Sequence, residues 1–155
     1  MRTVFWMATI IFVLDQVSKY LIVQVMNLKD VLSIDVWPPL LNLRMAWNTG
    51  INFGILSGGS RWIWIGLALV IVAFVLWWVY KDAQGRWQCI FAGVLVGGAL
   101  GNVIDRVVYG AVADFLNMSC CGFTNPTSFN VADIAVFVGA FGLIFSSSDK
   151  EKKAA

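Results

Sequence analysis

The sequence predicts an all-α membrane protein with four transmembrane helices and a small β-rich extracytoplasmic element. Of its 155 residues, 59% are hydrophobic and only 13% are charged, with a mean hydropathy of +0.78. Soluble domains carry about 25% charged residues, and a chain this short cannot hide so much apolar surface in a core of its own. Four apolar segments are each long enough to cross a bilayer of roughly 30 Å. We therefore expect one integral-membrane domain over residues 1–155.

Length and polarity define the four expected spans. They cover residues 4–26, 62–80, 87–108 and 129–145. The second contains no charged residue and is the clearest of the four. The first carries charges in its middle and is too long for a cleavable signal peptide, so we expect it to be retained as a helix.

The distribution of basic residues predicts the orientation, because Lys and Arg concentrate on the cytoplasmic side of membrane proteins. The basic residues that fall on one side of a four-span path are Arg2, Lys81, Arg86, Lys150, Lys152 and Lys153. Both termini are therefore expected to be cytoplasmic. The other side receives two longer loops, at residues 27–61 and 109–128.

The first of these loops is the expected β-rich element. Residues 40–47 alternate in part between apolar and polar side chains, and they follow the turn-forming pair Pro38-Pro39. A small β-structure on the outer membrane surface is the structure that this pattern favours.

Three glycines in the third span share one helix face. Gly93, Gly97 and Gly101 are spaced four residues apart, which allows a second helix to approach closely. A packing seam is the better interpretation for the first two. For Gly101, which precedes Asn102, a role in shaping a site is equally open.

The composition excludes several kinds of chemistry. The chain has no histidine, which excludes His-based zinc sites, Ser-His triads and Cys-His dyads. Its three cysteines are not spaced as zinc ligands, so we expect no metal and no cofactor. Cys120 and Cys121 are expected to be ordinary apolar loop residues rather than a strained disulfide. A net charge of +2, with scattered Lys and Arg, argues against nucleic acid as a partner.

Charges are expensive inside a membrane, by roughly 2.5–3.5 kcal/mol each on insertion scales. Asp15 and Lys19 are four residues apart in the first span and therefore lie on one helix face, where they can pair. We favour a structural ion pair over direct catalysis for these two residues.

Three further acids are expected near the outer membrane surface. Asp105 ends the third span, Asp114 lies in the following loop, and Asp133 begins the fourth span. Two carboxylates in a partly dry site can share one proton, so that one acts as general base on water and the other as general acid. A lone helix-end aspartate is more often a cap, and Asp133 also fits that interpretation.

Two other functions fit some of these features. Acids within the spans would suit an ion-coupled transporter, although its acids should lie near the midplane and reach both sides. The glycine face would suit a non-catalytic assembly subunit, which has no use for three acids at one surface.

Five short blocks of sequence resemble those of the lipoprotein signal peptidase (signal peptidase II) family. The blocks are D-Q-V-S-K at 15–19, N-T-G-I-N-F-G at 48–54, G-G-A-L-G-N-V-I-D-R at 97–106, V-A-D-F at 112–115 and F-N-V-A-D at 129–133. Each block is weak alone, but their order matches that of the family over nearly the whole chain. Ile51 and Asn52 stand where the family often has small residues.

The resemblance implies an intramembrane aspartyl endopeptidase of the bacterial inner membrane, with its active site near the extracytoplasmic surface. Its substrate would be a prolipoprotein with a diacylglyceryl-cysteine, cleaved N-terminal to that cysteine. Membrane lipid and globomycin-type cyclic peptide inhibitors would be further partners.

The resemblance also assigns residues. It implies a catalytic dyad of Asp114 and Asp133. Asp105 is the competing first member, ranked second because the adjacent Arg106 would hold it ionised and give it a structural partner. The residues implied to support the acids or bind substrate are Asn48, Gly50, Asn102, Asp105, Arg106, Asn130, Asp15 and Lys19. Turn formation by Asn48 and helix capping by Asn130 are the structural alternatives.

Overall fold

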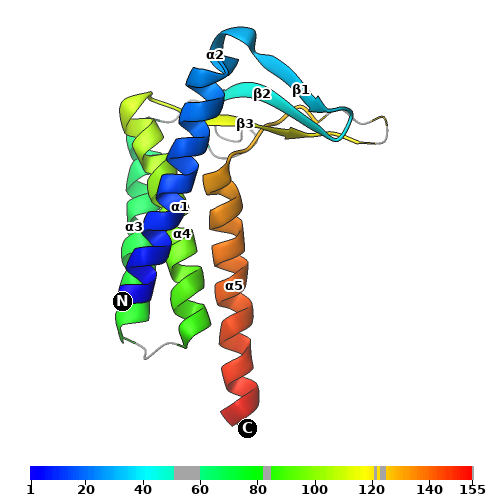
Figure 1. Cartoon of the computed structure of the whole chain (residues 1–155). Coiled ribbons are helices and arrows are strands. Elements are labelled where there is room, and N and C mark those ends of the chain that lie inside the picture. The colour runs from blue at the N-terminus through cyan, green and yellow to red at the C-terminus, as the bar shows by residue number, and fades with distance from the viewer. Residues whose placement is uncertain (51–59, 82–84, 121, 123–124, 155) are drawn as a thin grey trace.

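The computed structural model describes residues 1–50, 60–81, 85–120, 122 and 125–154, and side chains as far as Ser146. The helices are α1 (Arg2–Lys19), the π-helix η1 (Tyr20–Val25), α2 (Leu28–Val31), α3 (Arg61–Lys81), α4 (Arg86–Val108) and α5 (Val131–Ala154). The strands are β1 (Ser33–Trp37), β2 (Leu41–Asn48) and β3 (Val112–Met118). Long helices form a bundle with the sheet at one end, and both termini lie at the other end (Figure 1).

The long helices follow the predicted spans closely at most of their ends. Three helical segments of the described chain are long and apolar enough to cross a membrane: Arg2–Val25, Arg61–Lys81 and Arg86–Val108. The fourth predicted span corresponds to a shorter apolar stretch, Val131–Ser146. Helix α5 continues beyond that stretch to Ala154, past the end of the expected span at residue 145.

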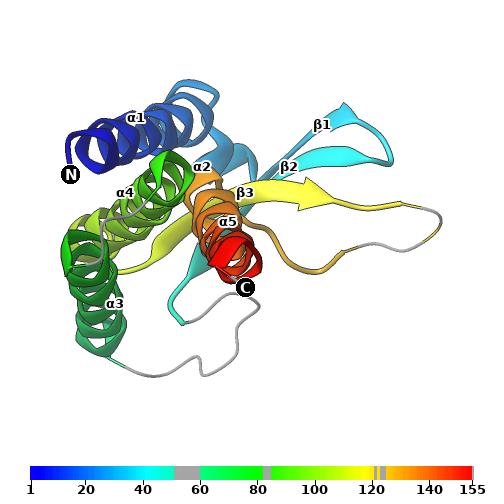
Figure 2. The same ribbon diagram turned by 90° about the horizontal axis from the view of Figure 1, so that it is seen from below.

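Helix α4 is the central element of the bundle, with α1, α3 and α5 packed around it (Figure 2). The predicted glycine seam is confirmed on the face toward α1, where a Cβ atom at Gly97 would lie 2.5 Å from the backbone oxygen of Ala8. A second contact of this kind, which the sequence analysis did not assign, faces α5: a Cβ at Gly98 would lie 2.5 Å from the backbone oxygen of Ala132. Backbone approaches this close require glycine.

The sheet has the order β1-β2-β3, with both strand pairs antiparallel. Strands β1 and β2 lie within the expected β-rich element at residues 27–61, whereas β3 comes from the second loop, at 109–128, for which no strand was predicted. In register, β2 and β3 place Ala46 opposite Asp114 and Asn48 opposite Val112. Five of the first six residues of β3 are buried, so the alternation that marks a half-exposed strand is missing from its sequence.

Two apolar clusters hold these layers together. One lies between the helices and includes Val4, Val72, Ala92 and Leu95. The other joins the sheet to the end of the first helical segment and has Val23, Leu28, Leu43, Ala113 and Phe115 at its centre. The sheet thereby covers one end of the bundle, and its far end projects sideways past the helices (Figures 1 and 2).

Some residues named from the sequence are not described. Ile51, Asn52 and Cys121 lie outside the described residues, whereas Cys120 is an exposed residue just after β3.

We predict that Gly97→Ala destabilises the bundle, because the added methyl group would meet the backbone of α1. Overpacking of this kind costs about 1–3 kcal/mol. Gly66→Ala in α3 is the matched control, since a Cβ there meets nothing within 4 Å. Thermal unfolding in detergent should show a lower midpoint for the first variant only; equal midpoints for the two variants would contradict the seam.

Candidate active site

Charged and amide side chains are buried where the helices meet the sheet. The buried polar residues of this region are Asp15, Lys19, Asp105, Asp114, Asn130 and Asp133. Such groups are seldom buried without partners, because removal from water is costly for a polar or charged group. Their hydrogen bonds therefore define what the site can do.

A buried ion triad lies at the end of α1. The Lys19 Nζ atom is 2.7 Å from Asp15 Oδ2 and 2.8 Å from Asp105 Oδ2. The first distance confirms the predicted pair within α1. The second corrects the partner expected for Asp105: its cation is Lys19 of α1, not the adjacent Arg106, because neighbouring residues of a helix point in different directions.

The triad also holds the backbone at two distant points of the chain. Asp15 Oδ1 accepts a hydrogen bond of 2.9 Å from the backbone N–H of Ala132. Asp105 Oδ2 accepts one of 3.2 Å from the backbone N–H of Ala113. These alanines directly precede Asp133 and Asp114, so the triad positions the start of α5 and the start of β3 relative to each other.

Gln16 is a fourth residue in contact with the triad, and no role was expected for it from the sequence. Its Nε2 atom lies 3.1 Å from Asp15 Oδ2 and 3.1 Å from Asp105 Oδ1, so one amide donates to both carboxylates. Its place directly after Asp15 in the first block was the available signal. The open question about Gly101 is also answered, since a Cβ there would lie 2.5 Å from Asp15 Oδ2.

Asp114 is presented by β3 rather than by a loop, which corrects the sequence expectation. Two side-chain amides donate to it: Asn130 Nδ2 lies 2.6 Å from Oδ1, and Asn48 Nδ2 lies 3.0 Å from Oδ2. Asn48 is brought there by β2, the neighbouring strand, and its Oδ1 accepts from the N–H of Gly50 at 3.1 Å. Asn48 therefore takes part in a turn with Gly50 and also donates a hydrogen bond to Asp114, as the two interpretations of it predicted.

Asp133 lies in the first turn of α5. Its Oδ1 accepts a hydrogen bond of 2.9 Å from Asn102 Nδ2, and its Oδ2 accepts one of 3.3 Å from the backbone N–H of Asn130. In return, Asn130 Oδ1 accepts from the backbone N–H of Asp133 at 2.8 Å. This reciprocal pair caps the helix and confirms the capping interpretation of Asn130.

Asn130 is the residue that links the two acids. It touches Asp114 through Nδ2 and Asp133 through its backbone and Oδ1. The same Nδ2 lies 3.2 Å from Asn102 Oδ1, which Lys19 Nζ approaches to 3.4 Å. A continuous chain of polar contacts therefore runs from the triad to both acids.

Arg106 points toward the loop that follows β2. Its Nη2 donates to the backbone oxygen of Gly50 at 2.9 Å, and its Nη1 donates to the backbone oxygen of Asn102 at 3.3 Å. Its Nε is buried and has no hydrogen-bond partner within the described part of the chain. Arg106 thus holds the turn that carries Asn48 and keeps one donor unused.

Burial, and to a smaller extent the negative charge of Asp133, raise the pKa of Asp114 to about 7. The hydrogen bonds from Asn48 and Asn130 and the charge of Lys19 act in the opposite sense and are outweighed. Near neutral pH this carboxyl group therefore exists in both protonation states. Two interacting acids, one of which exchanges a proton near pH 7, are suited to general acid–base chemistry.

We predict that Lys19→Met strongly destabilises the fold, because two buried carboxylates would lose their shared cation. Breaking a buried ion pair on one side costs about 3–5 kcal/mol. Lys29→Met is the matched control, since Lys29 is exposed and bonds only Gln24 in the described structure. The free energy of unfolding, from denaturant titration in micelles, should fall far more for Lys19→Met; similar losses in both variants would argue against the triad's role.

Comparison with known proteins identifies relatives over most of the chain. A family model described as Signal peptidase (SPase) II matches residues 7–148. The lipoprotein signal peptidase of Cupriavidus necator is 40% identical over 144 residues, which cover 90% of this chain and 80% of the relative. That of Alteromonas mediterranea is 38% identical over 156 residues, covering 96% of this chain and 83% of the relative.

The fold is also similar to solved structures. A bacterial membrane enzyme solved by the in meso method at 2.3 Å resolution superposes with a TM-score of 0.85 and is 31% identical; the match covers 100% of this chain and 93% of the other. A second, solved by the same method at 1.9 Å, has a TM-score of 0.79, is 33% identical and covers 94% of this chain and 92% of its own. With the family model matched from residue 7 to residue 148, the chain belongs to the signal peptidase II family.

Proposed function

We propose that this chain is an intramembrane aspartyl endopeptidase. It removes the signal peptide from prolipoproteins that carry a diacylglyceryl-cysteine, cutting on the N-terminal side of that cysteine. Membership of the signal peptidase II family supports lipoprotein processing by a membrane protease. The observation that carries the aspartyl mechanism is the pair of buried acids, Asp114 and Asp133, joined through Asn130.

The surroundings of the two acids favour different protonation states. Asp133 accepts hydrogen bonds from an amide and a backbone N–H at the N-terminus of α5, where the helix dipole stabilises negative charge. Asp114 is presented by strand β3 rather than by a helix, and its pKa is raised to about 7 by burial and by Asp133. We therefore assign the base to Asp133 and the acid to Asp114.

In this mechanism, ionised Asp133 removes a proton from a water molecule, whose oxygen attacks the carbonyl carbon that precedes the lipidated cysteine. Protonated Asp114 donates its proton to the carbonyl oxygen as the tetrahedral intermediate forms. Asp133 then gives its proton to the leaving amine, the C–N bond breaks, and Asp114 recovers its proton from the hydroxyl of the intermediate. Neither acid is consumed, and no metal takes part in any step.

The amides and the arginine have separate tasks in this proposal. Asn102 orients Asp133, and Asn48 and Asn130 orient Asp114. The unused Nε donor of Arg106 is suited to a backbone carbonyl of the substrate. The same donors would hold the peptide backbone of globomycin-type cyclic inhibitors.

Asp105 is a poorer first member of the dyad. Its Oδ1 accepts from Gln16, and its Oδ2 accepts from Lys19 and from the N–H of Ala113. A carboxylate whose two oxygens are held by a cation and two further donors is poorly placed to exchange a proton with a substrate. The ion-coupled transporter is likewise disfavoured, because these acids gather at one end of the bundle.

We extend the proposal to a single integral-membrane domain of the bacterial inner membrane, with four spans and the active site near the extracytoplasmic surface. The bundle end that carries both termini also carries the end of α3 at Lys81 and the start of α4 at Arg86 (Figure 1). The apolar part of α5, Val131–Ser146, is about 24 Å long at 1.5 Å per residue, less than the roughly 30 Å hydrocarbon core. A short fourth span would draw Asp133 below the membrane surface, to the depth of a lipid-anchored substrate.

We predict opposite reporter signals from fusions placed after Lys153 and within residues 117–128. The basic residues at the terminal end of the bundle should keep that end cytoplasmic. Paired alkaline phosphatase and green fluorescent protein fusions would measure this, because each is active on one side only. Equal signals at the two positions would contradict the four-span topology.

We predict that Asp114→Asn and Asp133→Asn each lower kcat by about a thousandfold or more, while the double variant is scarcely worse than either single one, because the two acids act as a unit. Cleavage of a lipidated precursor by purified protein in micelles is the measurement. Asparagine keeps the shape of aspartate, so substrate binding should survive.

Asp35→Asn is the control for this experiment, because Asp35 is exposed on β1 of the same sheet. It should cleave at the wild-type rate. An active Asp114→Asn together with an inactive Asp105→Asn would reassign the dyad to Asp105 and Asp133. Activity in all three Asn variants at positions 105, 114 and 133 would end the protease proposal.

We predict that kcat/KM falls as the pH rises through about 7, because the acid Asp114, whose pKa is raised to about 7, must be protonated. In Asn48→Ala this fall in kcat/KM should occur at higher pH, since the hydrogen bond from Asn48 lowers the pKa of Asp114. Asn42→Ala on the same strand is the control and should leave the pH of this fall unchanged. A fall in kcat/KM at lower pH in Asn48→Ala would show that Asp114 is not the acid.

A further inference from the structure

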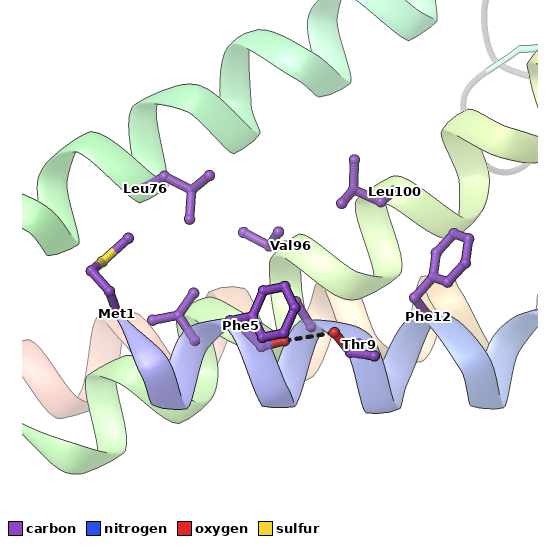
Figure 3. A pocket seen from close by; sticks show the side chains of 9 residues that line it. Met1, Phe5, Thr9, Phe12, Leu76, Val96 and Leu100 are labelled. Carbon is purple, nitrogen blue, oxygen red and sulfur yellow. Dashed lines mark hydrogen bonds between the residues drawn. The ribbon is translucent and has the colours of Figure 1, made fainter.

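A long apolar groove lies on the bundle away from the buried acids. It has a volume of about 530 Å³, within the range of roughly 300–1,000 Å³ that is typical of small-molecule sites. Phe5, Thr9 and Phe12 of α1 form one side, and Leu76 of α3 with Val96 and Leu100 of α4 form the other (Figure 3). The groove separates α1 from α3, which both pack on α4.

The dimensions of the groove match one leaflet of a bilayer. It runs along α1 from Met1 to Phe12, which is about 16 Å at 1.5 Å per residue. Half of a hydrocarbon core of roughly 30 Å has the same depth. The hydroxyl of Thr9 is already bonded to the backbone oxygen of Phe5 at 2.9 Å, so the lining offers little to a polar ligand.

The groove reaches Met1, at the bundle end that carries both termini, and basic residues occur at the helix ends there (Figure 1). Arg2 lies in the first turn of α1, Lys81 ends α3 and Arg86 begins α4, against one acid, Asp82, in the sequence of the connection. Exposed aromatic residues near the same helix ends are Trp77, Tyr80 and Trp87. Aromatic and basic side chains together mark the level of lipid headgroups.

We propose that this groove binds one anionic phospholipid of the cytoplasmic leaflet. One acyl chain fills the apolar groove, and the headgroup phosphate lies among Arg2, Lys81 and Arg86. Basic clusters between transmembrane helices on the cytoplasmic side are suited to acidic lipid headgroups. The bound chain would bridge α1 and α3 and so steady the helix that carries Asp15 and Lys19.

The charges favour lipid over two other apolar occupants. A signal peptide begins with a positively charged segment, which the three basic residues would repel. A second copy of this chain would bring the same cations to the same place. A phospholipid alone combines a hydrocarbon chain with the complementary negative charge.

The test compares lipid adducts by native mass spectrometry, with protein purified from nanodiscs of equal phosphatidylglycerol and phosphatidylethanolamine. Wild type should retain phosphatidylglycerol in preference. Thr9→Trp, which fills the groove, should lower its occupancy at least about tenfold. Ile10→Trp is the matched control, because Ile10 is exposed on the same helix outside the groove, and it should retain the lipid.

A charge variant tests the headgroup site and keeps the experiment decisive should Thr9→Trp not fold. Arg2→Gln, Lys81→Gln and Arg86→Gln together should abolish the preference for phosphatidylglycerol. The same change at Lys29, Arg44 and Arg61, which lie toward the sheet end, should preserve it. Three outcomes would each overturn the proposal. In the first, wild type retains the two lipids equally; in the second, the two Trp variants lose the lipid equally; in the third, an unlipidated signal peptide displaces the lipid. The readout does not involve cleavage, so its failure is distinguishable from failure of the proposed protease activity.

Discussion

The Lys19 ammonium group is buried between the carboxylates of Asp15 and Asp105, and the arrangement of the other elements depends on this contact. The ion triad joins α1 to α4 directly. The carboxylate oxygens of the triad also accept hydrogen bonds from the backbone N–H groups of Ala132 and Ala113, and so the triad orders α5 and β3. A buried charge cluster adds little net stability by itself, yet it tolerates few alternative arrangements, because any other leaves a charge without its partner.

Close helix contacts make the triad possible. Gly101 leaves room for the carboxylate of Asp15, and Gly97 and Gly98 bring α1 and α5 against the backbone of α4. Lipid offers no hydrophobic gain when two apolar helices meet, so such bundles rely on close packing and on polar contacts. In this protein the glycines of α4 and the ion triad lie in the same contact between α1 and α4, so close packing and the buried charges support each other.

The same side chain serves two purposes according to its surroundings. Asp15 and Asp105 face the Lys19 ammonium group and serve as structural acceptors of its hydrogen bonds. Asp114 and Asp133 instead face neutral amides from Asn48, Asn102 and Asn130, which orient them without fixing their charge. Burial and the negative charge of Asp133 raise the pKa of Asp114 into the neutral range, where this carboxyl group can gain or lose a proton.

The sequence alone determined the long apolar helices, the Asp15–Lys19 pair and the glycine seam, because each depends on residues close together in one helix. It also named the residues that surround the acids, through the ordered blocks of a family. The pairing of Lys19 with Asp105, the place of Asp114 on β3, and the link that Asn130 forms between Asp114 and Asp133 became visible in the folded chain. These contacts link residues far apart in the chain, and local periodicity contains no information on which distant donor will meet a given carboxylate.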